Sequence, residues 1–199
     1  DTWLFDGSKW EKGKSKIHPS LRSMMGMAAD PASGDVFLYG GWGPSEDGLT
    51  DLSDFWKFSS GKWTLLEQAA APGPRSSPMM APCAADGSLW LIGGHVHGES
   101  AGDVWKFAGG KWMLGSERAF DGESSELRMV ADPTTGSIAL IASTGFEEQD
   151  KDSSPVYFQD ITWIWDGRDW SKIISDSQPT ARALTQMVYE PYQNRFLLF

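Results

Sequence analysis

The sequence has one cysteine, no Asn-x-Ser/Thr acceptor site, and no apolar run of the roughly 18 residues that a membrane-spanning helix needs. A single cysteine, Cys83, excludes a disulfide framework. The missing acceptor site weighs slightly against a secreted glycoprotein and so slightly favours the cytoplasm. Basic residues are also scarce, with 17 Lys and Arg against 27 Asp and Glu. This balance argues against nucleic-acid binding, which requires a basic surface.

Tryptophan and glycine are abundant, with 11 and 22 copies in 199 residues. Eight of the tryptophans form pairs seven residues apart: Trp3/Trp10, Trp56/Trp63, Trp105/Trp112 and Trp163/Trp170. Each first Trp begins an aromatic-x-aromatic step, and a tight turn follows before the second Trp, so each pair predicts a β-hairpin. If the middle two of residues 59–62 form the turn, Phe58 lies opposite Trp63 and Trp56 opposite Leu65, on one buried face.

A second predicted hairpin precedes each of the later Trp hairpins. It begins near an arginine, turns at an Asp- and Gly-containing segment, and ends in a Gly pair, Gly40-Gly41 or Gly93-Gly94. The first Gly follows Arg22 or Arg75 by 18 residues in both copies. A third copy is degenerate, because it has Ser124 in place of the Arg and Ala142-Ser143 in place of the Gly pair.

Two hairpins, four short strands and a repeat near 50 residues describe one blade of a β-propeller. The pattern resembles the kelch repeat, with its Arg-led first strand, its Gly pair and its Asp-x-Trp third strand. The resemblance implies an all-β, kelch-type β-propeller with four-stranded antiparallel blades in one domain. We expect three complete blades, at 19–66, 72–115 and 121–174, plus two half blades, at 1–13 and 179–199.

The half blades have two interpretations. We expect the chain to be a fragment of a longer propeller. The alternative is that the two halves pair and close a four-bladed ring. The Trp and Gly pairs are expected to be packing residues rather than a ligand-stacking surface.

Repeat lengths differ mainly in the loops between second and third strands, at 41–54, 94–103 and 143–160. Such loops on a rigid scaffold commonly carry recognition, and the blade pattern places them on one face with the linkers between blades. Their formal charges together equal the net charge of −10 of the chain. The alternative is a solvated face that only aids solubility. The acidic candidates for partner binding are Glu46, Asp47, Asp51, Glu99, Glu147, Glu148 and Asp150.

Arg22, Arg75 and Arg182 should lie on the same face, near the central channel. In kelch domains that act as substrate adaptors, arginines on this face bind acidic peptides, and the resemblance implies the same role here. The alternative is that these arginines bind backbone carbonyls or a neighbouring loop carboxylate.

His95 and His97 alternate on one extended segment, where they are weak metal candidates together with Glu99 or Asp103. Two histidines do not specify a metal site, so we expect no cofactor and nominate no catalytic residue. The expected function is a non-catalytic protein-interaction scaffold, whose acidic loops suit a basic protein or an assembly. The alternative is a carbohydrate-active or sialate-mutarotase-like enzyme with its site in the central channel.

Overall fold

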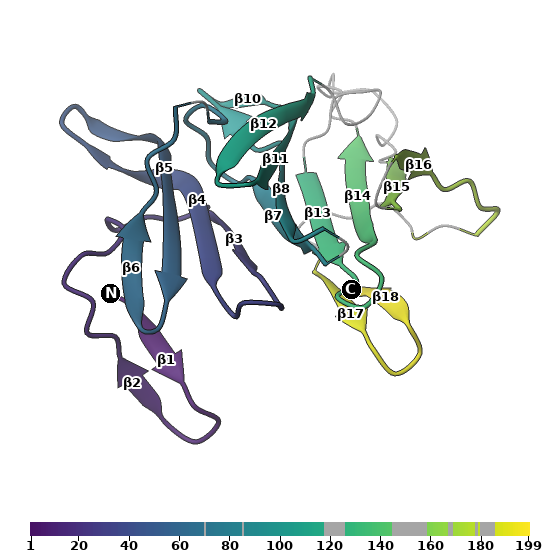
Figure 1. The fold of residues 1–199 in the computed structure, drawn as a ribbon. Coiled ribbons are helices and arrows are strands. Elements are labelled where there is room, and N and C mark those ends of the chain that lie inside the picture. Colours follow the sequence, from purple (N-terminus) through teal and green to yellow (C-terminus); the bar gives the residue numbers. More distant parts are fainter. Residues whose placement is uncertain are drawn as a thin grey trace, which may run out of the picture.

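The computed structural model describes residues 1–69, 71–84, 86–117, 126–144, 159–166, 169–177, 179 and 186–199. Across these residues the chain forms antiparallel β-strands joined by turns and loops, with no helix (Figure 1). It follows that none of the described segments is a helix long and apolar enough to cross a membrane. The all-β class expected from the sequence is confirmed.

Three sheets have four strands each, and we call them sheets A, B and C in chain order. Sheet A contains, in spatial order, β3 (Gly26–Ala29), β4 (Val36–Ser45), β5 (Gly48–Ser59) and β6 (Lys62–Leu65). Sheet B contains β7 (Met79–Cys83), β8 (Ser88–Ile92), β11 (Val104–Ala108) and β12 (Lys111–Ser116). Sheet C contains β13 (Glu126–Ala131), β14 (Ile138–Thr144), β15 (Gln159–Trp165) and β16 (Trp170–Lys172).

The remaining described strands form three separate two-stranded sheets. They are β1 (Trp3–Phe5) with β2 (Trp10–Lys12), β9 (His95–Val96) with β10 (Glu99–Ser100), and β17 (Met187–Glu190) with β18 (Arg195–Leu198). Among the described residues, no strand pairing joins β1–β2 to β17–β18. The alternative in which these two hairpins combine into one sheet is therefore not seen.

The tryptophan hairpins have the predicted register. In sheet A, Phe58 pairs with Trp63 and Trp56 pairs with Leu65, which confirms both expected cross-strand pairs. The turn residues Ser60 and Gly61 both have positive φ, at 48° and 79°. Two consecutive positive φ angles are typical of a type I′ turn, whose twist matches that of the flanking strands. Local turn chemistry thus fixes which aromatic rings meet.

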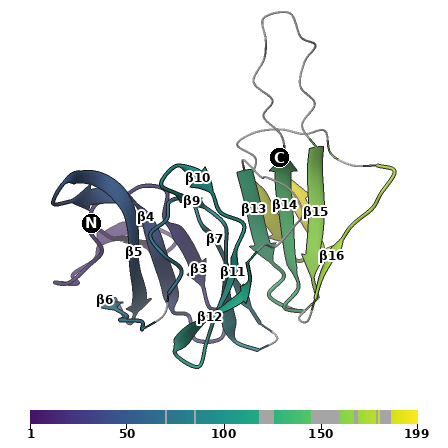
Figure 2. The ribbon, with the colours of Figure 1, turned by 90° about the horizontal axis from the view of Figure 1, so that it is seen from above.

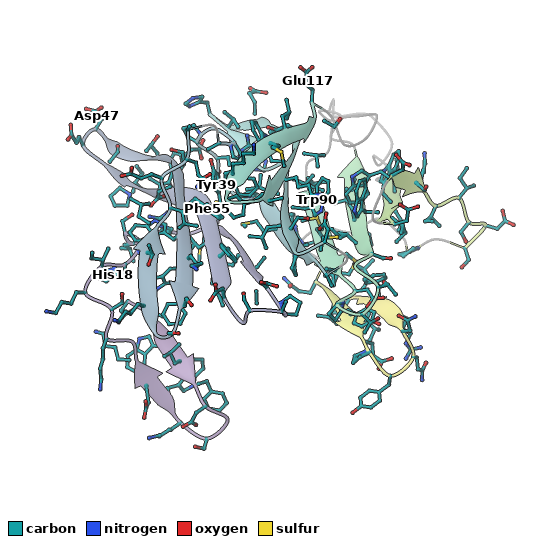
Figure 3. The ribbon with its side chains drawn as sticks, in the orientation of Figure 1. His18, Tyr39, Asp47, Phe55, Trp90 and Glu117 are labelled. Carbon is teal, nitrogen blue, oxygen red and sulfur yellow. The ribbon has the colours of Figure 1, made fainter. Side chains whose placement is uncertain are left out.

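The sheets pack face against face in chain order (Figures 1 and 2). Their first strands lie side by side, β3 against β7, β7 against β13, and β13 against β17. The core between sheets A and B is aromatic: Tyr39 and Phe55 from sheet A pack with Met80, Leu91 and Trp112 from sheet B (Figure 3).

The core between sheets B and C is built in the same way. Trp90 of sheet B packs against Trp165 of sheet C, with ring centroids 4.7 Å apart. Each of sheets B and C therefore buries residues of both of its faces. The accessible parts of these two sheets are the outer strands β12 and β16 and the loops that leave the strand ends.

Candidate functional site

Arg75, which precedes β7, is the centre of a buried polar arrangement in sheet B. Its side chain is 4% exposed. The two terminal nitrogens donate to Oδ1 and Oδ2 of Asp103 over 2.7 and 2.9 Å, and Nη1 also donates to the Gly93 carbonyl over 3.0 Å. Nε donates to the Gly73 carbonyl over 3.2 Å. The indole of Trp105 donates to Asp103 Oδ2 over 2.5 Å, so one carboxylate binds both the guanidinium and the tryptophan.

Sheet A contains the same arrangement around Arg22. Its Nη1 and Nη2 donate to the two carboxylate oxygens of Asp54 over 2.5 and 2.7 Å, and Nη1 also donates to the Gly40 carbonyl. Ser20 accepts from Nε and Nη2, and the Trp56 indole donates to Asp54. All five N–H donors of Arg22 therefore have acceptors. We call this combination of Arg, Asp, Trp and Gly carbonyl the Arg–Asp unit.

The two carboxylates of the Arg–Asp units are held ionised. Burial opposes ionisation, but hydrogen bonds from Arg75 and Trp105, with the attraction of the guanidinium, lower the pKa of Asp103 below its ordinary value. The pKa of Asp54 is lowered for the same reasons by Arg22 and Trp56. The structure thus engages Arg22 and Arg75 internally, as the sequence-based alternative describes. Their role in partner binding stays a prediction, and Arg182 lies outside the described residues.

The Gly pairs allow this arrangement because they accept a close backbone crossing. Gly94 has φ of 97°, and a Cβ there would lie 2.6 Å from the Ser76 carbonyl oxygen. Ser76 exchanges backbone hydrogen bonds with His95 over 3.0 and 2.7 Å. Gly41 has φ of 107° and meets Ser23 in the same way. The Gly pair therefore lets the Arg-bearing segment cross the second strand where the loop leaves the sheet.

The first acidic loop is an extension of the sheet. Strands β4 and β5 continue pairing beyond Gly41 to form a two-stranded projection, residues 41–52, which we call the ribbon (Figures 1 and 2). Glu46 and Asp47 form its exposed tip (Figure 3). Asp51, at its base, is instead 6% exposed. One of the three acidic residues nominated in this loop is thus buried.

The second acidic loop contacts the first. It contains the β9–β10 hairpin, whose turn residue His97 has φ of 53°. The backbone N–H of His97 donates to Asp51 Oδ2 over 2.9 Å, across the boundary between sheets A and B. Glu99 is exposed on β10. We call the ribbon and residues 95–100 together the loop face. The other nominated acids, Glu147, Glu148 and Asp150, lie outside the described residues.

The structure does not assemble the histidine candidates into a metal centre. His95 lies in β9 and His97 in the following turn, while Asp103 is bound by Arg75. Within the described ranges, no three His, Cys, Asp or Glu side chains are grouped so that they could hold a metal ion.

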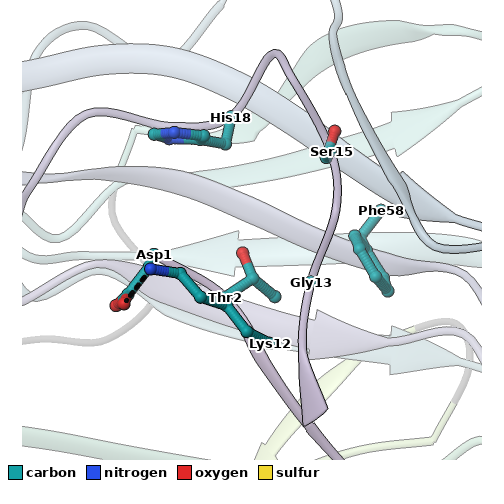
Figure 4. Close-up of a pocket in the computed structure, with 7 residues that line it drawn as sticks. All are labelled: Asp1, Thr2, Lys12, Gly13, Ser15, His18 and Phe58. Atoms are coloured by element: carbon teal, nitrogen blue, oxygen red, sulfur yellow. Dashed lines mark ion pairs between the residues drawn. The ribbon is translucent and has the colours of Figure 1, made fainter.

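Sequence reasoning missed a pocket of about 210 Å³ beside the outer part of sheet A (Figure 4). Its polar groups are largely engaged. Thr2 Oγ1 accepts the Trp63 indole N–H over 2.8 Å, Ser15 Oγ accepts the Trp63 backbone N–H over 3.0 Å, and Lys12 pairs with Asp1 over 3.3 Å. The two bonds to Trp63 hold the β1–β2 hairpin and the following linker against sheet A, and no short sequence motif marks them. The lining residues are Asp1, Thr2, Lys12, Gly13, Ser15, His18 and Phe58.

Comparison with known proteins gives no further assignment, because neither a protein-family model nor a curated protein matches this chain.

Proposed function

We propose that this chain is part of a kelch-type β-propeller and that it binds a protein partner through its loop face, without catalysing a reaction. Support for the propeller comes from three four-stranded antiparallel sheets whose first strands lie side by side. Two of these sheets share the Arg–Asp unit, which joins the first and third strands of one repeat. A repeated unit that packs on its neighbours by both faces is the design principle of a propeller.

One observation carries the binding role. The side chains of Glu46, Asp47 and Glu99 are exposed on the loop face, and within the described residues none of these side chains forms an ion pair or hydrogen bond. The loops that bear them are anchored, because the Arg–Asp units fix the strand ends and Asp51 ties the two loops together. Unpaired charge of one sign on an anchored scaffold attracts a partner of the opposite charge.

The test is charge reversal of these three exposed acids. The variant Glu46→Lys/Asp47→Lys/Glu99→Lys should lose its partner in quantitative affinity capture from a lysate of the source cells, while the wild type retains it. Asp51 is left intact because it is buried and fastens the β9–β10 turn. Thermal unfolding should show that the variant is folded.

A matched control separates position from net charge. Asp47→Lys and Glu11→Lys change the charge equally, but Glu11 lies on β2, away from the ribbon tip (Figure 1). Only Asp47→Lys should weaken capture. Unchanged recovery by the folded triple variant would rule out the loop face as the binding surface.

A further inference from the structure

We infer that the partner docks on one side of the ribbon, and that it does so with a segment carrying both apolar and basic side chains. This inference rests on the proposed function and specifies the partner's chemistry. It comes from the register of the ribbon, from the exposure of its apolar residues and from the carboxylates beside them.

The register places three apolar side chains on one side of the ribbon. Trp42 pairs with Asp51, and Pro44 pairs with Leu49. Side chains two residues apart on a strand project to the same side, and directly paired residues share it. Trp42, Pro44, Leu49 and Asp51 therefore form one side, which we call the docking side.

The docking side is apolar and accessible. Trp42 is 39% exposed and Leu49 is 65% exposed, and Pro44 between them is also exposed. Elsewhere in sheets A and B, large aromatic side chains such as Phe55 and Trp112 are buried between the sheets. An exposed Trp beside an exposed Leu on a projecting ribbon is the kind of anchor that dominates protein interfaces.

The charges around these apolar residues select a basic partner. Glu46 and Asp47 lie at the tip and are exposed and unpaired within the described structure. Asp51, at the other end of the docking side, is buried, and its Oδ1 has no hydrogen-bond partner there. Because this oxygen is covered, Asp51 acts on a bound segment through its negative charge rather than through a direct hydrogen bond.

The partner chemistry follows from these two features. Leucine-like side chains would bury Trp42 and Leu49, and Lys or Arg side chains would meet the carboxylates and the face of the Trp42 ring. An acidic segment would meet only like charge. The expected occupant is therefore a protein segment in which basic and apolar residues alternate.

The test uses a short synthetic peptide of alternating Lys and Leu as the probe. Two control peptides replace every Leu with Ser, or every Lys with Glu. Binding to the full chain is measured by calorimetry and by the ¹⁵N-indole resonance of Trp42, assigned with Trp42→Phe. We expect saturable binding of the Lys–Leu peptide, a shift of the Trp42 resonance, and no binding of either control peptide.

Substitutions locate the contact. Trp42→Ala and Leu49→Ser should each weaken binding about tenfold or more, as expected for anchor residues. Trp10→Ala, which removes a 63% exposed tryptophan from the separate β1–β2 hairpin, should leave binding unchanged. Equal binding of the Leu-to-Ser peptide, or undiminished binding by Trp42→Ala, would overturn the inference.

The captured partner distinguishes this inference from the proposed function. If charge reversal of the loop face abolishes capture but Trp42→Ala and Leu49→Ser do not, the docking side is wrong and the loop face still binds. If charge reversal leaves capture intact, the proposed function itself fails.

Discussion

Sheets B and C have the same four-stranded order, but among the residues of these two sheets that the structure describes, only those of sheet B form an Arg–Asp unit. Trp105 and Trp163 occupy equivalent positions, because they pair with Leu91 and Leu140 of the second strands. Two residues earlier, sheet B has Asp103, whereas sheet C has Ile161. At this position of its third strand, sheet C therefore has no carboxylate to receive an arginine.

The strand ladders differ accordingly. In sheet B the pairing of β8 with β11 ends at Ile92, just before the Gly pair. In sheet C the pairing of β14 with β15 continues without a break from Ile138 to Thr144, and Ala142 is fully buried where sheet B has Gly93. The Gly pair and the buried arginine thus belong together, since a buried guanidinium needs its carboxylate and the close crossing that only Gly permits. Sheet C lacks the Asp and the Gly pair together, as this interdependence requires.

The largest predicted effect comes from breaking the unit in sheet B. Arg75→Ala leaves Asp103 and the Gly93 carbonyl without their buried donor, and should lower the free energy of unfolding by about 3–5 kcal/mol. Arg195→Ala, which breaks the half-exposed ion pair of Arg195 with Glu190 in the β17–β18 hairpin, should cost about 1 kcal/mol or less. Urea denaturation of both variants measures the difference.

The double variant tests the interdependence directly. Arg75→Met/Asp103→Ile gives sheet B the apolar residue of sheet C and removes both charges. It should cost less than the sum of the two single variants, because neither charge is left buried alone. Strict additivity would show that the two residues stabilise the sheet independently.

The next effect comes from the Gly pair. Gly94→Ala places a Cβ 2.6 Å from the Ser76 carbonyl oxygen at a φ of 97°, so both strain and a backbone clash oppose it. Backbone strain alone costs about 1–3 kcal/mol. Gly98→Ala is the matched control, because its φ is 86° but nothing lies within 4 Å of the added Cβ. Gly94→Ala should be the more destabilising in urea denaturation, and equal losses would show that the crossing at Ser76 is not restrictive.

The sequence predicted the tryptophan hairpins well, for physical reasons that are local. A two-residue turn and alternating aromatic residues fix the pairing of Phe58 with Trp63, because all the determinants lie within a few residues. The Arg–Asp unit depends instead on residues far apart in the chain, such as Arg75 and Asp103. The sequence showed the arginine before the first strand and the Asp-x-Trp step of the third strand, but it did not show that the arginine and the aspartate bind each other.

The burial of Asp51 was not predictable either. Its cover is the β9–β10 turn, which belongs to the loop of the next sheet. The sequence does not distinguish exposed from buried acidic residues in a loop, yet Asp47 is exposed and Asp51 is buried by a neighbouring repeat. Contacts between repeats, rather than composition, decide which loop charges can meet a partner.

A smaller predicted effect concerns the aspartates in the first turns of sheets B and C, whose pKa values are lowered by different groups. Burial opposes the ionisation of Asp86, but hydrogen bonds from Lys106 and Ser88 lower its pKa to about 2. Burial also opposes the ionisation of Asp132, whose pKa is lowered to about 2 chiefly by the hydroxyls of Thr135 and Thr134. Both carboxylates therefore stabilise the folded state when the pH is above 3.8, the ordinary pKa of an aspartate. This stability is lost as the pH falls from about 4 to about 2.

Salt should separate the two carboxylates. The Lys106 ion pair of Asp86 is half-exposed and is screened by about 1 M salt, whereas the hydroxyl hydrogen bonds of Asp132 carry no net charge. A ¹³C carboxyl titration by NMR should show the pKa of Asp86 rising with salt and that of Asp132 nearly constant. Equal shifts would mean that the lysine does not control Asp86.

The smallest effect concerns Lys106 itself. Its Nζ lies 2.5 Å from Asp86 Oδ2 and 5.3 Å from the centroid of the Trp90 ring, which pairs with it across the strands. In sheet C the equivalent cross-strand pair is Ala139 with Ile164, so an apolar pair is compatible with this sheet geometry. Lys106→Met keeps the apolar stem and loses only a half-exposed ion pair and the cation–π contact, so it should cost about 1 kcal/mol or less in urea denaturation. A loss approaching that of Arg75→Ala would show that the two ion pairs of sheet B are equally critical, although one is buried and the other is half in water.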